Sequence, residues 1–208
     1  MCIRDRLRIG VNRMNIIRQR IDDSINLKKS LLENEQLITT VTQVADIIKT
    51  SLGNGGKIII CGNGGSASDA LHFAGEIVGR FQKERNPWPA VVLNADVATL
   101  TAIANDYGYE EVFARQAKAH LTDKDIFVGI STSGNSKNII KAVDVAKTVG
   151  AKSVAFLGKD GGALGRIVDY PIIVQSNNTA RVQECHIMLI HIICEIVENL
   201  LSEEESVS

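Results

Sequence analysis

Five short apolar runs, separated by longer amphipathic segments, constrain this chain more than any other feature of its sequence. Near-continuous apolar strands that alternate with helices are typical of a parallel sheet covered by helices on both faces. We therefore expect an α/β fold, a three-layer α/β/α sandwich with a five-stranded parallel sheet, that binds ligands beyond the carboxyl ends of its strands. The five predicted strands are Lys57 to Cys61, Ala90 to Leu93, Ile126 to Ile130, Ser153 to Leu157 and Ile172 to Val174.

Composition bounds the class of protein. A chain of 208 residues fits within one hydrophobic core, since single cores grow to ~250 residues. The formal net charge of −1 gives no bulk attraction to nucleic acid or to a membrane surface, and aromatic residues make up only 4%. The four cysteines form no CxxC pair, as expected of buried thiols in a reducing cytosol. No uninterrupted apolar run approaches 18 residues, so we expect a cytoplasmic protein without a membrane or nucleic-acid partner.

Two helices are predicted before the first strand. Apolar residues recur at helical spacing from Met14 to Asn34 and again from Glu35 to Leu52. The preceding residues 1–13 carry four arginines and no such stripe. We expect residues 1–13 to be a disordered or non-native extension and residues 14–208 to form a single domain that includes the helical pair.

The stretch from Lys57 to Arg80 combines a glycine turn with an acid/base pair. Gly62, Gly64 and Gly65 end the first strand, and an amphipathic helix is predicted to follow, with Ser66 or Ser68 as its N-cap. His72 and Glu76 are four residues apart in this helix, so they share one face about one turn from each other. The turn places backbone amides at the positive end of the helix, which favours an anion nearby.

Two other interpretations of this glycine turn stay open at this point. Gly62, Gly64 and Ala67 satisfy the G-x-G-x-x-A pattern of dinucleotide-binding folds, and Asp96 after the second strand could bind the ribose. The pattern is weak alone, and glycines can serve backbone geometry only.

A second loop favours phosphate. Four hydroxyl residues follow the strand Ile126 to Ile130 and precede a helix predicted from Lys137 to Val149; they are Ser131, Thr132, Ser133 and Ser136. A helix N-terminus with this many neutral donors is a ready phosphate site, whereas a cap needs one serine. The chain has no GxxxxGK loop, so a phosphosugar fits better than a nucleoside triphosphate.

The last predicted helix, Thr179 to Leu201, is apolar on most sides, which favours burial against the sheet and at a subunit interface. It carries Gln183 and His191, eight residues apart, within ~80° of each other on the helical wheel. A lone histidine in such a helix usually forms a core hydrogen bond. Two helices that each offer a histidine and a second oxygen donor favour a shared site.

Five strings carry a resemblance to a known family: CGNGGSASDALHFAGEIVGR, TAIANDYG, GISTSGNS, LGKDGG and ARVQECHIMLIH. From about Met14 to Leu201 the chain resembles the sugar isomerase (SIS) domain, and within it the phosphoheptose isomerases. That family converts D-sedoheptulose 7-phosphate to D-glycero-D-manno-heptose 7-phosphate through an enediol, the first step of ADP- or GDP-heptose biosynthesis. The resemblance implies a homotetramer whose active sites lie between subunits, and zinc as a cofactor.

The resemblance also implies roles for individual residues. The family's metal-ligand positions match His72, Glu76, Gln183 and His191, and its acid/base pair matches Glu76 and His191. Its substrate-binding positions match Asn63, Gly64, Gly65, Glu76, Asn105, Asp106, Ser131, Thr132, Ser133, Ser136 and Gln183.

One departure and one alternative accompany this resemblance. Ala180 stands where some members have an acidic residue, so no role for that carboxylate is expected here. The related SIS proteins that bind a replication initiator offer an alternative function, a non-catalytic phosphosugar-binding protein that regulates a partner. Those proteins lack the equivalents of Glu76 and His191, both of which this chain has.

Overall fold

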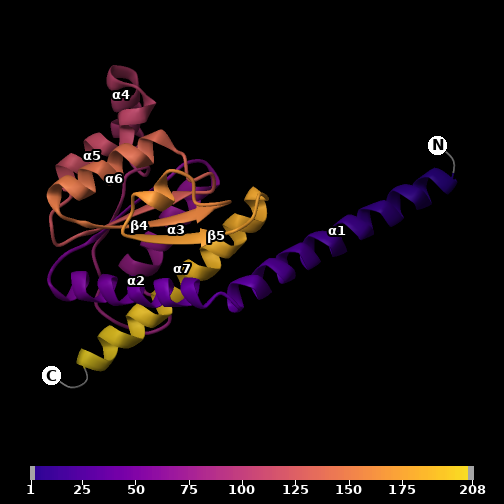
Figure 1. Cartoon of the computed structure of the whole chain (residues 1–208), viewed down its shortest axis with the longest axis horizontal. Coiled ribbons are helices and arrows are strands. Elements are labelled where there is room, and N and C mark those ends of the chain that lie inside the picture. The colour runs from indigo at the N-terminus through magenta and orange to yellow at the C-terminus, as the bar shows by residue number, and fades with distance from the viewer. Residues whose placement is uncertain (1–2, 206–208) are drawn as a thin grey trace.

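The computed structural model describes the backbone of residues 3–205 and the side chains of residues 13–202. Its strands alternate with helices as the apolar runs predicted (Figure 1). The elements in chain order are α1 (Ile3–Leu32), α2 (Glu35–Gly53), β1 (Ile58–Gly62), α3 (Gly65–Val78), β2 (Ala90–Val92), α4 (Val97–Tyr107), η1 (Tyr109–Glu111), α5 (Val112–His120), β3 (Ile126–Ser131), α6 (Lys137–Val149), β4 (Lys152–Gly158), η2 (Leu164–Arg166), β5 (Tyr170–Val174) and α7 (Thr179–Glu205).

All five strands are parallel, in the order β2-β1-β3-β4-β5, which confirms the predicted fold class. Strand β2 lies on one side of β1, whereas β4 and β5 lie on the other side of the sheet, beyond β3. The direction in which successive strands are added therefore reverses between β1 and β3. Gly62 at the end of β1 pairs with Ile130 near the end of β3. The loops after β1 and β3 therefore begin side by side at the point where open α/β sheets bind ligands.

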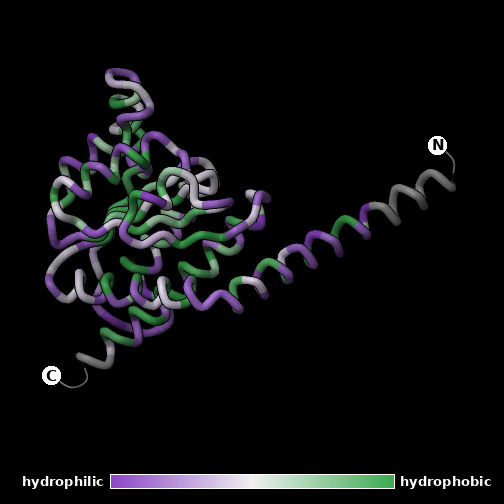
Figure 2. Tube along the Cα trace, viewed as in Figure 1, coloured by the Kyte–Doolittle hydropathy of each residue, from purple (hydrophilic) through white to green (hydrophobic). Residues whose placement is uncertain are grey.

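Two hydrophobic clusters fill the layers above and below the sheet. One packs α2, α3 and α7 against inward side chains such as Ile58, Val128 and Phe156. The other packs α5 and α6 against the opposite face, through Ile59, Phe127 and their neighbours. Figure 2 shows hydrophobic residues concentrated in the central strands. Because both faces of the sheet are covered, every residue of β1 and β3 is buried, which explains their uninterrupted apolar runs.

The first helix differs from its expected bounds. Helix α1 begins at Ile3 rather than near Met14, and it projects from the body of the protein (Figure 1). Met1 and Cys2 lie outside the described residues, and the expectation that residues 1–13 are a disordered or non-native extension stays a prediction. Along the projecting part, Ile16, Ile17 and Ile21 are exposed.

The remaining strand bounds shift by one or two residues. The largest shift is in β5, which begins at Tyr170 and includes Pro171 rather than starting at Ile172. Proline lacks the N–H that a central strand needs, but β5 is the last strand of the sheet, where a missing donor can face away from the neighbouring strand.

Helix α7 is the core helix that its composition predicted. The segment Thr179–Ser202 is long and apolar enough to span a membrane by length and composition, and half of its most apolar window is buried inside the fold. Its buried residues pack with α2 and α3, so core packing accounts for the buried half of this apolar helix. Three cysteines, Cys61, Cys185 and Cys194, are buried free thiols, as expected.

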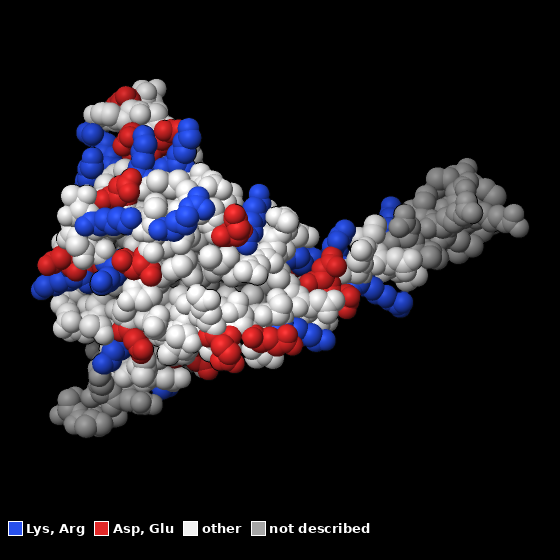
Figure 3. Space-filling model, in the orientation of Figure 1, with Lys and Arg blue, Asp and Glu red and all other residues white. Residues whose placement is uncertain are grey.

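The face in Figure 3 carries lysine and arginine interspersed with aspartate and glutamate, without a broad field of one sign. This distribution agrees with the net charge of −1.

Candidate active site

The turn between β1 and α3 depends on its glycines. A Cβ at Gly62 would lie 2.3 Å from the carbonyl oxygen of Ser66, and Gly64 has a φ of +57°. Gly64, not a serine, is the N-cap of α3, and it provides no side-chain hydrogen bond. The predicted cap at Ser66 or Ser68 is therefore wrong, because the chain enters α3 through Gly64, whose φ is positive, and both serines lie inside the helix. The N-cap provides no side-chain hydrogen bond to the backbone amides at the start of α3, so these amides can face a ligand.

Asn63 connects this turn to two elements that carry no recognisable motif. Its side-chain amide and that of Asn138 in α6 exchange two hydrogen bonds of 3.0 Å. The hydroxyl of Tyr109 donates a third hydrogen bond, also 3.0 Å, to Oδ1 of Asn63. Sequence reasoning selected Asn63 but missed Asn138 and Tyr109, since these contacts span 75 and 46 residues.

Three candidate metal-binding or acid/base side chains meet between α3 and α7. Nε2 of His72 lies 2.9 Å from Oε1 of Glu76 and 3.2 Å from Nε2 of His191. The donor atoms of the three residues all lie within 4.8 Å of one another. The structure thus brings the helical pair His72 and Glu76 together with His191, as the resemblance implied.

The geometry of this cluster fits a small cation. Ligand atoms held ~2.0–2.1 Å from zinc at tetrahedral angles lie roughly 3.3 Å apart, close to the 2.9 and 3.2 Å contacts of His72. A single Nε2 atom cannot donate to Glu76 and also accept a proton from His191. A shared cation satisfies all three groups without requiring an added proton, so the residues fit the zinc site that the family implies.

Asp69 adds a buried polar atom one turn before His72. Its Oδ2 has no hydrogen-bond partner within the described part of the chain. Burial raises the pKa of Asp69 above its usual range, and the nearby His72 opposes that shift. Unpaired buried oxygens are rare in folded proteins and are often found at functional sites.

Gln183 lies at the other end of α3. A Cβ added to Gly65 would lie 2.5 Å from Nε2 of Gln183, so the side chain of Gln183 covers the first residue of the helix. The glycine at position 65 therefore leaves the space that Gln183 occupies. The role of Gln183 as a metal ligand or substrate contact stays a prediction.

The hydroxyl loop after β3 gathers as expected. Oγ of Ser131 lies 2.8 Å from Oγ of Ser136 and 3.4 Å from Oγ of Ser133. Ser136 is the N-cap residue of α6, yet it makes no side-chain cap hydrogen bond. The capping role considered for these serines is thus unfilled, and the first turn of α6 has no serine cap to compete with an anion.

The loop after β4, which carries the LGKDGG string, packs against the hydroxyl loop. Gly134 has a φ of +66°, and its position leaves no room for a Cβ because the carbonyl oxygen of Gly161 would lie 2.1 Å from it. Asn135 accepts a hydrogen bond from the amide of Ala163, and Leu164 donates to the carbonyl of Gly134. The carbonyl oxygen of Thr132 packs closely against Gly158. The LGKDGG string therefore shapes the backbone of the hydroxyl loop.

The structure does not bring Asn105 and Asp106 onto the cluster. Both are exposed on α4, where Nδ2 of Asn105 donates to Oδ1 of Asp106 at 2.8 Å. Asp96, the alternative ribose ligand, is the N-cap of α4 and binds Thr99. Asp96 therefore already has a structural role, which weakens the dinucleotide interpretation.

Comparisons with known proteins decide the family. A family model described as the SIS domain matches residues 22–158. The phosphoheptose isomerase of Thermodesulfovibrio yellowstonii is 52% identical over 187 residues, which span 90% of this chain and 92% of that protein. This chain belongs to the phosphoheptose isomerase family of SIS-domain proteins. The phosphoheptose isomerase of Aneurinibacillus thermoaerophilus is 47% identical over 92% of this chain and 97% of its own length.

Solved structures of phosphoheptose isomerases share this architecture over most of the chain. The structure from Francisella tularensis has a TM-score of 0.85 at 37% identity, and the one from Neisseria gonorrhoeae has 0.84 at 39%. Each match covers 89% of this chain and 98% of the other chain. Phosphoheptose isomerases are aldose-ketose isomerases, so the family favours an enzyme over a non-catalytic phosphosugar-binding regulator.

Proposed function

We propose that this protein interconverts D-sedoheptulose 7-phosphate and D-glycero-D-manno-heptose 7-phosphate. The observation that carries the proposal is the meeting of Glu76, His72 and His191 between two helices, with donor atoms within 4.8 Å of one another. The adjacent ends of β1 and β3 place the glycine turn and the hydroxyl loop beside each other. The phosphate and the reacting end of the sugar then bind to separate parts of one site.

The isomerisation moves a proton between C1 and C2 of the sugar through an enediol. In our assignment the carboxylate of Glu76 transfers this proton, and His191 acts as its acid/base partner at the carbonyl oxygen. Positioned groups of this kind contribute ~10²–10⁴ in rate, about 3 to 5 kcal/mol. The serine hydroxyls and the amides at the start of α6 hold the phosphate, whose binding energy fixes the sugar relative to Glu76.

Zinc is the proposed cofactor, held by His72, Glu76, Gln183 and His191. When bound, it would supply a Lewis acid that polarises the sugar's carbonyl group, and this would take the place of proton transfer by His191, because a ligating imidazole nitrogen is not free to carry a proton. The three described donor atoms are spaced for such an ion. Asn63, Gly64 and Gly65 orient the sugar beside this cluster, and Asn105 and Asp106 complete the proposed substrate contacts.

We further propose a cytoplasmic homotetramer whose active sites lie between subunits. The support is the projecting helix α1, on which several apolar side chains are exposed to solvent: Met14, Ile16, Ile17, Ile21 and Ile25. A row of apolar side chains on a helix whose main contacts are with α2 and α7, near its end, is typical of an interface with other copies. Light scattering on the purified protein is expected to give the mass of four chains.

A coupled isomerase assay with sedoheptulose 7-phosphate tests the proposed activity. The parent protein is expected to turn the sugar over, and Glu76→Gln to lose at least about a hundredfold in kcat. Glu195→Gln, which alters an exposed carboxylate of α7, is the matched control and should keep the parental rate. A parent protein without turnover, or a Glu76→Gln variant at the parental rate, would overturn the proposal.

A further inference from the structure

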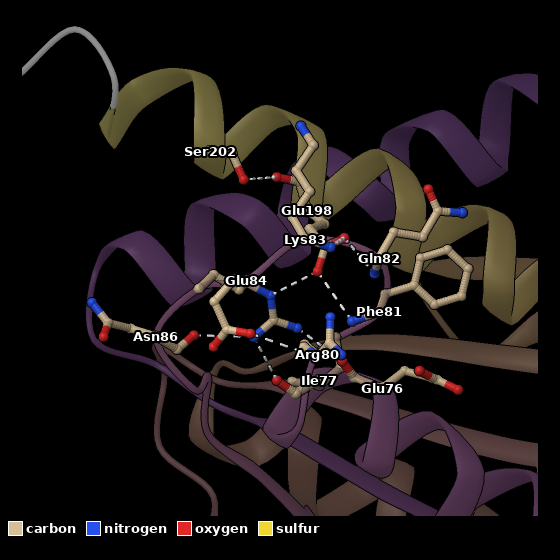
Figure 4. A network of polar contacts seen from close by, with 11 residues as sticks. Glu76, Ile77, Arg80, Phe81, Gln82, Lys83, Glu84, Asn86, Glu198 and Ser202 are labelled. Carbon is tan, nitrogen blue, oxygen red and sulfur yellow. Dashed lines mark hydrogen bonds and ion pairs between the residues drawn. The ribbon is translucent and has the colours of Figure 1, made fainter.

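The loop between α3 and β2, residues 79–89, is folded around one buried carboxylate. Glu198 of α7 accepts hydrogen bonds from the backbone amides of Phe81, Gln82 and Lys83, at 3.1, 2.7 and 2.8 Å (Figure 4). Nε of Arg85 donates a fourth, at 3.0 Å. Both side chains of the Arg85–Glu198 pair are 2% exposed.

Four donors keep this carboxylate ionised. Burial alone raises the pKa of Glu198, but the three amides and Arg85 outweigh burial and hold the pKa below its usual range. Buried ion pairs are weak evidence for stability, because removing two charges from water offsets much of their attraction. The contacts of this pair with α3 and with Phe81 point to a role other than stability.

Arg85 also binds the end of the helix that carries Glu76. Its Nη2 donates to the backbone carbonyl of Glu76 at 2.8 Å, and its Nη1 donates to the carbonyls of Ile77 and Asn86 at 3.1 and 3.0 Å. The guanidinium stacks over the ring of Trp88, 3.5 Å from its centroid. Helix α3 has no basic residue in its own last turn. Arg85 thus binds carbonyls at the end of the helix; that of Ile77 also accepts a hydrogen bond from the amide of Trp88.

Glu198 is connected to the other side of the cluster. It follows His191 by seven residues, so the two lie on the same face of α7, about 10 Å apart along the helix. The ring of Phe81, whose amide binds Glu198, lies 5.8 Å from the imidazole of His191 between centroids. One ion pair therefore contacts the backbone of Glu76 and holds the aromatic neighbour of His191.

We propose that Arg85 and Glu198 are positioning residues that fix the spacing of Glu76 and His191 across the two helices. This inference rests on the proposed function, since it concerns the same metal and proton-transfer groups. Neither residue touches the substrate; the pair acts through the main chain of Glu76 and the ring of Phe81. Loss of such supporting contacts typically costs ~10–100-fold in metal affinity or activity.

Glu198→Gln tests the proposal because it keeps the shape of the side chain and removes its charge. We expect its dissociation constant for Co²⁺, followed by the ion's visible absorption, to rise at least about tenfold. We expect kcat to fall by about the same factor while KM stays within roughly threefold, since the phosphate loop lies on other elements. Arg85→Lys keeps the positive charge but loses the planar fork, and it carries the same expectation, so it decides if Glu198→Gln does not fold.

Asp125→Asn is the matched control. Asp125 is also a buried carboxylate with four hydrogen bonds, from the amide and Nζ of Lys57 and the amide and hydroxyl of Thr122. It lies just before β3, at the opposite end of the strands from the site. We expect this variant to lose stability in urea but to keep parental Co²⁺ binding and kcat.

The outcomes separate the two proposals. Variants of Arg85 and Glu198 that bind Co²⁺ and turn over substrate like Asp125→Asn would show that the pair is only structural, and would overturn the inference. A parent protein that neither binds Co²⁺ nor depends on Glu76 would instead overturn the proposed function itself.

Discussion

The Nε2 atoms of His72 and His191 lie 3.2 Å apart, although 119 residues separate the two histidines in the chain. Two imidazole nitrogens at this distance, with Oε1 of Glu76 2.9 Å from one of them, are spaced as ligands of one metal ion. We therefore expect His72→Gln to weaken Zn²⁺ binding by at least about a hundredfold, measured by competition with a chromogenic chelator.

His120→Gln serves as the control for that measurement. His120 is exposed at the end of α5 and lies outside the cluster. Equal Zn²⁺ affinity in the His72 and His120 variants would exclude the cluster as the metal site.

Ser131 is expected to contribute to phosphate binding. Its buried hydroxyl contacts those of Ser133 and Ser136, so Ser131→Ala removes the central hydroxyl of this cluster of three serines. A hydrogen bond to a charged group is worth ~1.5–3 kcal/mol, which predicts a rise in KM of about ten- to a hundredfold with little change in kcat. Inhibition by inorganic phosphate should weaken by a similar factor.

Ser153→Ala provides a comparison for that substitution. Ser153 is equally buried, and its hydroxyl binds Asp169. This variant should lose stability while its KM stays parental. A Ser131→Ala variant with unchanged KM would remove the hydroxyl loop from the phosphate site.

Much of the fold follows from local pattern. The apolar runs predicted five parallel strands because each strand of a covered sheet is buried on both faces, as β1 and β3 are. Strand ends were less predictable, since Pro171 is tolerated in β5 only because that strand lies at the edge. The cap of α3 was mispredicted because the choice between Gly64 and a serine depends on backbone angles that composition does not encode.

In the candidate site, too, residues close in sequence were predictable from their spacing, whereas contacts between distant segments were not. His72 and Glu76 follow from helical spacing, whereas the position of His191 beside them came from the resemblance. Tyr109 and Asn138 were missed because their contacts join distant segments and belong to no motif. Glu198 had one usable signal, its position seven residues after His191 on the same face of α7.

Two glycines of α3 should respond in opposite ways to alanine. A Cβ at Gly65 would meet the flexible end of Gln183 at 2.5 Å, so Gly65→Ala displaces that side chain with little loss of stability. We expect its kcat/KM to fall at least about tenfold if Gln183 contacts the metal or substrate as proposed.

Gly75→Ala is the matched substitution in the same helix. No atom lies within 4 Å of the Cβ position at Gly75, so alanine adds helix propensity without a clash. It should raise the free energy of unfolding by ~0.5–1 kcal/mol and leave kcat/KM unchanged. A Gly65→Ala variant as active as Gly75→Ala would remove Gln183 from the site.

Acid is expected to destabilise the protein through His186. Burial lowers the pKa of this histidine from 6.5 to about 4, and the hydrogen bond with the carbonyl of Leu157 opposes that shift only in part. Its Nδ1 is buried without a partner among the described residues, so a second N–H on an imidazolium would go unpaired. Native His186 therefore stays neutral at pH values where an unfolded chain is already protonated.

The sign of the effect follows from proton binding. Between pH 6.5 and about 4 the unfolded chain binds the extra proton, so the free energy of unfolding falls as the pH falls, by about 3 kcal/mol over the whole window. His186→Gln removes this titration and can still donate to the carbonyl of Leu157. We expect urea unfolding at pH 7.5 and pH 4.5 to show a loss about 2 kcal/mol larger in the parent than in His186→Gln. Carboxylates with a lowered pKa, such as Asp125, are present in both proteins, so the difference isolates His186. An identical pH dependence in the two proteins would show that His186 is protonated equally in the folded and unfolded states.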